Sequence, residues 1–365
     1  MVIPVVRCTT ATATAPMEQS VLHVNQANKN KVRQYWASLD AADPDALFDA
    51  ASAFLPDNFC CKGSAPLGTL RGPEALAKQF LAPLKRAIPD LQRQIHLFMG
   101  GQSSDHVEEG GKDAYWVAGT GYLTGTATQQ FLGIPARQQP LRIRWSEFIR
   151  FDGEHMVESQ MIIDFVDWFD QIGLPVLPRS RGAEHVFPAP TGYDGVLSEP
   201  QNTEDTELSL KLGNELLYGA LNGFDQKALG SMGMAGFFHP NLKWYGPGGI
   251  GACLSFTEFE QLHQQHWLVA FPDRKVVGIE SLFAEGLMLA ASGVAGVEAT
   301  QTGPYLGVEA SGAHLKISGI DFWLRSETQF TENWVFVDMI DLFNQMGVDL
   351  FDRMATLRDH QSTAL

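Results

Sequence analysis

The chain has 365 residues, which is enough for two or three domains, and its hydrophobic fraction of 45% is ordinary for a globular protein. A net charge of −16 argues against nucleic acid or an anionic membrane as a partner, because phosphate recognition needs clustered Lys and Arg. No apolar run approaches the roughly 20 residues that cross a bilayer. The four cysteines form no CxxC pair, which argues against a zinc site or a disulfide framework and indicates a reducing, cytoplasmic compartment.

The first half of the chain reads as helices followed by strands. We expect residues 1–24 to be a disordered tail. Apolar residues at helical spacing then cover 25–55, and a second helix is expected between Gly72-Pro73 and Pro89. Strand-like runs separated by glycine-rich turns follow at 91–101, 114–126, 141–151 and 155–166. Helices followed by a run of antiparallel strands predict an α+β domain.

The second half repeats this order after a segment without periodicity. Residues 174–205 are rich in Pro, Gly and charge, which predicts a partly extended linker. Helical patterns are then expected at 210–238 and 255–271, and strands at 275–284, 287–302, 313–326 and 329–340. We expect domains at 25–173 and 206–354, and a C-terminal tail at 355–365.

The two halves align residue by residue at their ends. With a constant offset of 174 residues, WSEFIRFDGEHMVESQMIIDFVDWFDQIG at 145–173 falls on GIDFWLRSETQFTENWVFVDMIDLFNQMG at 319–347. The front parts align with an offset of 183, which places Pro89-Asp90 on Pro272-Asp273. A repeat of this length is a domain and not a short solenoid unit.

The last long strand of each copy carries the candidate catalytic acids. Because strand side chains alternate between two faces, one face is expected to hold Glu158, Gln160 and Asp164 in the first copy and Glu332, Trp334 and Asp338 in the second. If that face lines an apolar pocket, desolvation would raise the pKa of a carboxyl and make it a base near neutral pH. The alternative is that Asp164 and Asp338 are ordinary caps of the short helical stretch that follows.

Other polar residues give weaker signals. Glu147 and Asp321 align on the preceding strand, where a solvated or cross-strand paired carboxylate is the more usual interpretation. Trp244 and Tyr245 could line a pocket or belong to the core. His263 and His266 share one helix face, but no third ligand for a metal is evident. The glycine-rich segments at 119–125 and 246–251 fit neither a dinucleotide fingerprint nor a phosphate loop.

The motifs in both copies resemble one known family. WYGPGGIG, AFPD, FAEG and TQTGPYLGVEASGAHLKI, followed by E-x-W-x-x-x-D and NQMG, are similar to the SnoaL-like polyketide cyclases of the NTF2-like superfamily. The first copy resembles the same family through AIPD, GTATQQFLGIPA and E-x-Q-x-x-x-D before DQIG. The resemblance covers about residues 30–173 and 208–350, which is most of the chain.

The resemblance implies two cone-shaped α+β barrels, each with a curved antiparallel sheet wrapped by N-terminal helices around an apolar pocket. It implies acid/base chemistry without metal or cofactor, by Asp338 and, less clearly, Asp164. The expected substrate-binding residues are Trp334, Glu332, Gln301, Trp244, Tyr245, His263, Gln160 and Glu158. The sequence departs from the family where a pocket histidine is replaced by Ala127 and Gln301, and where Gln160 replaces the tryptophan.

Two functional hypotheses follow. The first is a cofactor-independent cyclase or isomerase-like enzyme acting on an apolar, polyketide-like carbonyl compound. The second is a non-catalytic protein that binds a small hydrophobic ligand in the same pockets. A cofactor-free hydrolase is a third possibility, although no residues that would orient a water are evident. We also expect the two copies to pair within the chain, as an intramolecular pseudo-dimer that could form a further homodimer.

Overall fold

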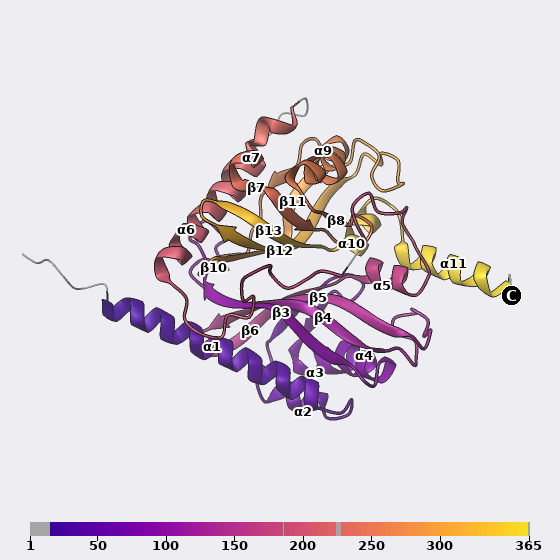
Figure 1. Ribbon diagram of the computed structural model, residues 1–365. Helices are drawn as coiled ribbons and strands as arrows, with labels where there is room; N and C mark the ends of the chain where they lie inside the picture. The colour runs from indigo at the N-terminus through magenta and orange to yellow at the C-terminus, as the bar shows by residue number, and fades with distance from the viewer. Residues whose placement is uncertain (1–14, 185, 224–227, 364–365) are drawn as a thin grey trace, which may run out of the picture.

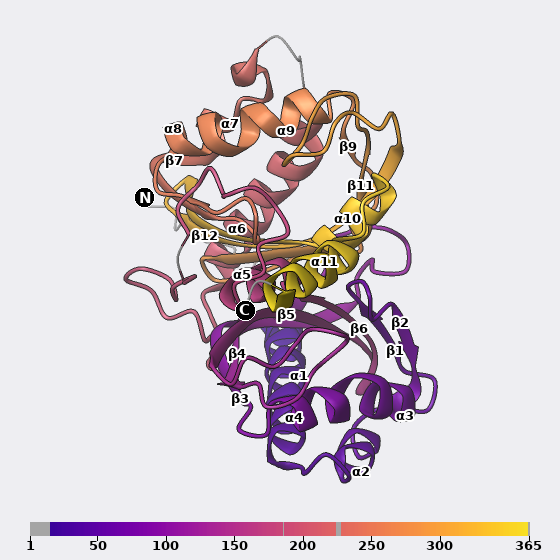
Figure 2. The same ribbon diagram turned by 90° about the vertical axis from the view of Figure 1, so that its right-hand side faces the viewer.

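The computed structural model describes residues 15–184, 186–223 and 228–363. It contains two curved sheets that lie against each other in the middle of the molecule, with helices covering the outer side of each (Figures 1 and 2). This arrangement confirms the α+β fold class and the tandem copies.

The first domain is built on a six-stranded sheet with the order β2-β1-β6-β5-β4-β3. All pairs are antiparallel except β1 and β6, which run parallel. The expected all-antiparallel sheet is therefore corrected to a mixed one. The strands are β1 (Cys60–Gly63), β2 (Thr69–Arg71), β3 (Gln92–Gln102), β4 (Tyr115–Thr126), β5 (Pro140–Asp152) and β6 (His155–Ile163).

Helices close the outer side of this sheet (Figure 2). The long α1 packs along β3, and the helical segment before Pro89 begins at Gly72-Pro73, where proline is tolerated in the first turn. These elements are α1 (Ala15–Ala41), α2 (Leu47–Ser52), α3 (Gly72–Leu76), η1 (Ala77–Leu81), α4 (Ala82–Ala87) and, after the sheet, α5 (Phe165–Gln171).

The second domain repeats the plan. Its sheet order is β10-β11-β12-β13-β7-β8, β9 pairs with β11, and β7 runs parallel to β13 as β1 does to β6. The strands are β7 (Phe238–Tyr245), β8 (Ala252–Cys253), β9 (Lys275–Val276), β10 (Ser281–Glu285), β11 (Met288–Thr300), β12 (His314–Ser326) and β13 (Gln329–Val337).

Its helical layer is more broken than that of the first domain. The helices are α6 (Thr203–Asn214), η2 (Glu215–Gly219), η3 (Ala220–Asn222), η4 (Leu229–Met232), α7 (Met234–Phe237), α8 (Phe256–Glu258), η5 (Phe259–Gln264), α9 (Gln265–Ala270), α10 (Met339–Gln345) and α11 (Leu350–Thr363). Figure 1 shows α7 and α9 at the top, over the second sheet, whereas α10 and α11 lie at the right, beside α5 of the first domain.

An aromatic cluster joins the two sheets. The ring of Phe148 in β5 lies 5.8 Å from that of Phe283 in β10 and 5.3 Å from that of Phe322 in β12. Trp334 and Phe336 of β13 belong to the same buried cluster. Both faces of each sheet are therefore buried, the outer one under helices and the inner one under the other sheet.

The expected linker runs between the sheets in specific contacts. Phe187 is buried there, and the guanidinium of Arg144 lies 4.1 Å from the centre of its ring. Leu197 is buried as well, and its backbone N–H donates to the carbonyl of Phe98.

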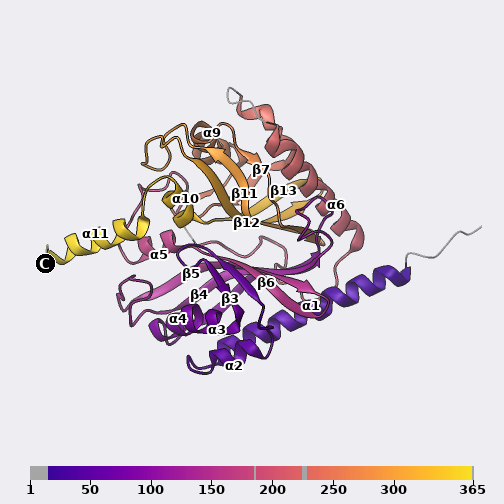
Figure 3. The ribbon, with the colours of Figure 1, turned by 180° about the vertical axis from the view of Figure 1, so that it is seen from behind.

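The boundaries of both expected tails are wrong where the structure describes them. Helix α1 begins at Ala15, so residues 15–24 are helical, which agrees with the helix-forming residues Ala, Met, Glu and Gln in this stretch. Residues 1–14 lie outside the described part of the chain. At the other end α11 continues to Thr363 (Figure 3). The side chain of Gln361 in this helix donates to the carbonyl of Gly173.

Candidate functional site

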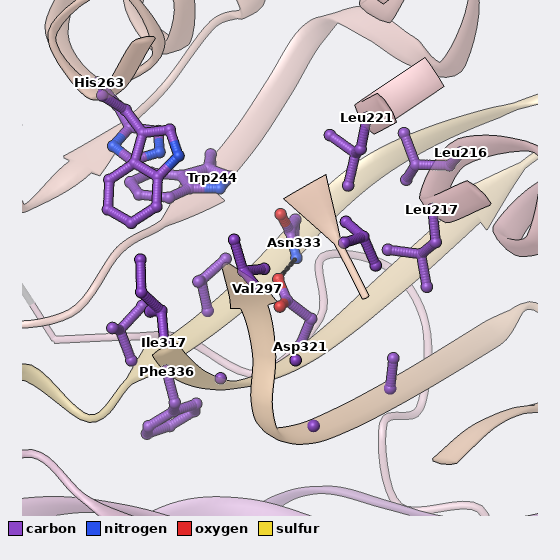
Figure 4. A pocket seen from close by; sticks show the side chains of 18 of the residues that line it. Leu216, Leu217, Leu221, Trp244, His263, Val297, Ile317, Asp321, Asn333 and Phe336 are labelled. Carbon is purple, nitrogen blue, oxygen red and sulfur yellow. Dashed lines mark hydrogen bonds between the residues drawn. The ribbon is translucent and has the colours of Figure 1, made fainter. Parts of the chain in front are cut away.

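The second domain contains a cavity of about 190 Å³ between its sheet and its helices (Figure 4). Most of its wall is apolar or aromatic, and Leu216, Leu217 and Leu221 close one side of it. The floor is the helix-facing side of β11–β13. This floor includes Ala291, Val297, Ile317, Asp321, Asn333 and Val335. A ligand in this chamber would contact mainly apolar side chains.

Asp321 is the carboxylate on the floor. Burial raises its pKa from 3.8 to about 7, and the hydrogen bond from Asn333, which favours the charged form, offsets part of this rise. The Nδ2 of Asn333 lies 3.2 Å from Oδ1 of Asp321 and 2.9 Å from the carbonyl of Phe322, so it is held in place by the neighbouring strand (Figure 4). Asp321 keeps some accessible surface because it faces the cavity. A carboxyl in this state exchanges protons near neutral pH.

A stacked aromatic pair forms the opposite wall. The ring of His263 lies 4.2 Å from that of Trp244, and the two are nearly parallel (Figure 4). Burial, with smaller contributions from Arg274 and His266, lowers the pKa of His263 to about 3. His263 is therefore neutral at physiological pH, and the pair offers a flat, uncharged surface to a ring compound. Both residues were predicted from the sequence to bind substrate, and both lie in this chamber.

The corresponding space in the first domain is filled. Glu147 occupies the position of Asp321, but its Oε2 accepts a hydrogen bond of 2.8 Å from Nε1 of Trp36. Trp36 packs edge to face against Trp145, and the guanidinium of Arg93 lies over both rings. A cavity of only about 40 Å³ remains.

One difference between the repeats accounts for much of this filling. Trp145 pairs with Ile163 in the first sheet, and Gly319 pairs with Val337 at the same register in the second. A large indole therefore projects where the second copy has only a hydrogen atom. Gly319 lines the chamber, so its lack of a side chain helps to leave the space open.

Asp164 and Asp338 lie at the junction of the domains, outside the chamber, and the catalytic role expected for them stays a prediction. Asp338 borders a separate cavity at this junction, and burial raises its pKa from 3.8 to about 6. Oδ1 of Asp164 accepts from the N–H of Asp167, and Oδ1 of Asp338 accepts from that of Asp341, so each caps its following helix. The helix capping expected from the sequence is thus confirmed.

The second oxygen of each acid reaches the other domain. Oδ2 of Asp164 accepts from the N–H of Gly248 at 2.9 Å, and Oδ2 of Asp338 accepts from the N–H of Ala65 at 2.8 Å. Ala65 and Gly248 occupy equivalent loops in the two copies. We call this reciprocal pair of contacts the aspartate clasp, and it gives a structural reason for both copies to carry the acid.

Three predicted substrate-binding residues hold the linker instead. Oε1 of Glu332 accepts from the N–H of Thr191, Nε1 of Trp334 donates to the carbonyl of Pro188, and Tyr245 packs against the ring of Phe187. The face of β13 that carries Glu332 and Trp334 was expected to line the pocket, but it packs toward the linker and the first domain. An apolar, aromatic strand face suits a sheet–sheet interface as well as a pocket, so the strand pattern could not distinguish them.

The remaining predicted residues also lie away from the chamber. Nε2 of Gln160 donates to Glu280 at 2.6 Å, and Glu158 forms an ion pair with Lys62, both at the domain junction. Gln301 is fully buried and ties its loop together by bonding to the carbonyls of Gly303 and Glu309 and to Ser311.

Sequence reasoning undervalued Asp321 and missed Asn333. The alignment of Glu147 with Asp321 was visible, but nothing in one strand indicates that a carboxylate lies over an empty space. The replacement of Trp145 by Gly319 was the available signal, since it marks the copy whose interior has room.

Comparison with known proteins agrees with this architecture. The chain belongs to the SnoaL-like polyketide cyclase family, whose profile matches residues 29–172 and 236–346. No curated protein matches the chain.

Similar solved structures each cover about two fifths of this chain. A protein described as a SnoaL-like polyketide cyclase from Jannaschia sp. CCS1 is 15% identical, with a TM-score of 0.35, over 40% of this chain and 97% of its own. AclR from Streptomyces galilaeus, described as a hydroxylase, is 21% identical with a TM-score of 0.32 over 39% and 97%. IdmH from Streptomyces antibioticus, described as a polyketide cyclase, is 17% identical with a TM-score of 0.31 over 38% and 99%.

Residues 15–184, 186–223 and 228–363 contain no group of three His, Cys, Asp or Glu side chains placed to hold a metal ion. Among the helices in this part of the chain, none combines the length and apolar character needed to cross a bilayer.

Proposed function

We propose that the second domain is a cyclase or isomerase-like enzyme that acts on an apolar carbonyl compound by direct acid/base chemistry at Asp321. The observation that carries this proposal is a carboxyl with a pKa of about 7 on the floor of an apolar chamber. Membership of the polyketide cyclase family is consistent with a polyketide-like substrate.

The proposed reaction begins with a proton transfer. The carboxylate of Asp321 takes a proton from the carbon next to a carbonyl, which leaves an enolate on the substrate and a neutral carboxyl on the protein. In a cyclase the enolate carbon attacks a second carbonyl of the same molecule, and Asp321 returns the proton to the new alkoxide. In an isomerase Asp321 returns the proton to a different carbon of the enolate. A pKa near the working pH suits both transfers.

Asn333 and the chamber walls support this role. The Nδ2 of Asn333 fixes the orientation of the Asp321 carboxyl. The neutral His263 and Trp244 form a flat surface for an unsaturated ring. The first domain, whose interior is filled around Trp36 and Trp145, serves in this proposal as a scaffold.

The alternative is a binding protein with the same chamber. It is favoured by Gln301, which replaces the pocket histidine of the family and is fully committed to its own loop. In that case Asp321 would act only as a hydrogen-bond partner for the ligand.

The two functions differ in carbon–hydrogen exchange. We would incubate the protein with 1-tetralone in D₂O and follow exchange of the α-protons by NMR, with binding measured separately by calorimetry. The enzyme proposal expects protein-dependent exchange that Asp321→Asn abolishes while binding persists. Asp338→Asn is the matched control, because it changes a buried carboxyl outside the chamber, and it should keep the exchange rate.

Binding without any protein-dependent exchange, for 1-tetralone and for larger ketones alike, would support the binding protein instead. If exchange is lost in Asp338→Asn and kept in Asp321→Asn, the reacting carboxyl lies at the domain junction and the proposal is contradicted.

A further inference from the structure

A further polar side chain borders the chamber, and it has no role in the proposed proton transfer. Gln264 ends η5 and is only 3% exposed. It borders the same cavity as Asp321. Within the described residues neither its Oε1 nor its Nε2 has a hydrogen-bond partner.

Several other polar groups on the chamber wall are paired, although Nε1 of Trp323 also lacks a partner among the described residues, and Gln264 is distinguished by having both amide atoms unpaired. Asn333 donates both to Asp321 and to the carbonyl of Phe322. The hydroxyl of Ser292 lies 2.7 Å from that of Ser281. A buried amide with both ends unpaired costs free energy, and protein interiors contain few of them. Both amide atoms are covered by neighbouring atoms, so the side chain of Gln264 would have to turn toward the chamber to meet a partner that enters it.

The chemistry of that partner follows from the amide. A primary amide presents an acceptor and a donor side by side, so its best complement presents a donor and an acceptor side by side. A lactam with its N–H beside its carbonyl has this pattern, and so does a ketone with an enol or hydroxyl next to it. The rest of the wall, with the stacked His263 and Trp244, suits the apolar rings of such a compound.

We propose that Gln264 is a specificity-determining residue that selects fused-ring carbonyl compounds with a hydrogen-bond donor beside the carbonyl. An apolar cavity of about 150 Å³ accepts benzene, so a chamber of about 190 Å³ is of the right order for a small ring compound. The inference rests on the proposed function only in using the same chamber, because selection is a matter of binding and needs no proton transfer.

Three probes of nearly equal shape test the proposal. The first is 2-quinolinone, which has the N–H and the carbonyl side by side. The second is N-methyl-2-quinolinone, which keeps the carbonyl and loses the donor. The third is naphthalene, which has neither. Binding of each is measured by calorimetry at pH 7 to the full chain, to Gln264→Leu and to Gln265→Leu, the last being an exposed residue of the same helical stretch.

The unchanged protein should bind 2-quinolinone about tenfold more tightly than N-methyl-2-quinolinone, which is the worth of roughly one hydrogen bond. Gln264→Leu should remove this preference and bind naphthalene at least as tightly as before. Gln265→Leu should behave as the unchanged protein. A Gln264→Met variant, which has a similar length and lacks both the amide donor and the amide acceptor, covers the case in which the leucine variant fails to fold, and it too should lose the preference.

The outcomes separate this inference from the proposed function. Asp321→Asn should keep the preference for 2-quinolinone whether or not the protein is an enzyme. Equal affinity for the two quinolinones would overturn the role of Gln264, and so would a preference that survives in Gln264→Leu. Failure of all three probes to bind would overturn the proposed ligand class.

Discussion

Replacing Asp321 by asparagine should stabilise the protein, and more so as the pH rises. The structure places this carboxyl where burial raises its pKa from 3.8 to about 7. Between pH 3.8 and about 7 the Asp321 carboxyl is therefore protonated in the folded protein and ionised in the unfolded chain. Stability is then highest below pH 4, falls as the pH rises through the folded pKa, and levels off above it. Asparagine has nearly the same shape and cannot ionise, so the variant avoids this loss.

The size of the effect follows from the shift. One pKa unit corresponds to about 1.4 kcal/mol, so a rise of about 3 units sets an upper limit of about 4 kcal/mol at pH 8. Asp321 faces a cavity that water can enter, which reduces the penalty. We therefore expect Asp321→Asn to exceed the unchanged protein by about 1–3 kcal/mol in free energy of unfolding at pH 8. At pH 4 the difference should be near zero.

The assay is urea unfolding at pH 4, 5, 6, 7 and 8, followed by tryptophan fluorescence, with the exposed Asp57→Asn as the control. The difference between Asp321→Asn and the unchanged protein should grow between pH 4 and 8, while the control shows no such growth. A difference that stays constant with pH would show that Asp321 ionises normally. The chamber would then be too well solvated for the chemistry proposed above.

Three further outcomes follow from the same geometry. Gly319→Trp should place an indole where the first copy has Trp145 and abolish ligand binding in calorimetry; binding at unchanged affinity would mean that the ligand site lies elsewhere. Asp338→Ala should lower the free energy of unfolding by about 2 kcal/mol, from a lost helix cap and a lost bond to the other domain, with chamber binding unchanged; an effect on binding alone would contradict the aspartate clasp. Asn333→Ala should raise the pKa of Asp321, because it removes a hydrogen bond that favours the charged form, so the midpoint of the pH–exchange profile should move to higher pH; a shift to lower pH would refute this assignment.

Much of the architecture could be predicted from the sequence. The repeat at an offset of 174 residues, and strands recognised by alternation and glycine turns, were enough for the tandem α+β fold and the family. The parallel strands β1 and β7 were not predicted, because each pairs with a strand far along the chain, and β1 has only four residues. Asp164 and Asp338 were located correctly at the start of a helix, where local hydrogen bonds decide their role.

The sequence by itself determined which residues share a strand face, because alternation is a local property of the backbone. Only the tertiary structure decided which face looks inward. The two sheets pack against each other, so both faces of β13 are buried and both need apolar side chains. The tertiary structure also decided whether the interior of each barrel is open or filled. The side chains of Trp36 and Trp145 fill the interior of the first copy, whereas Gly319 leaves the same space free in the second.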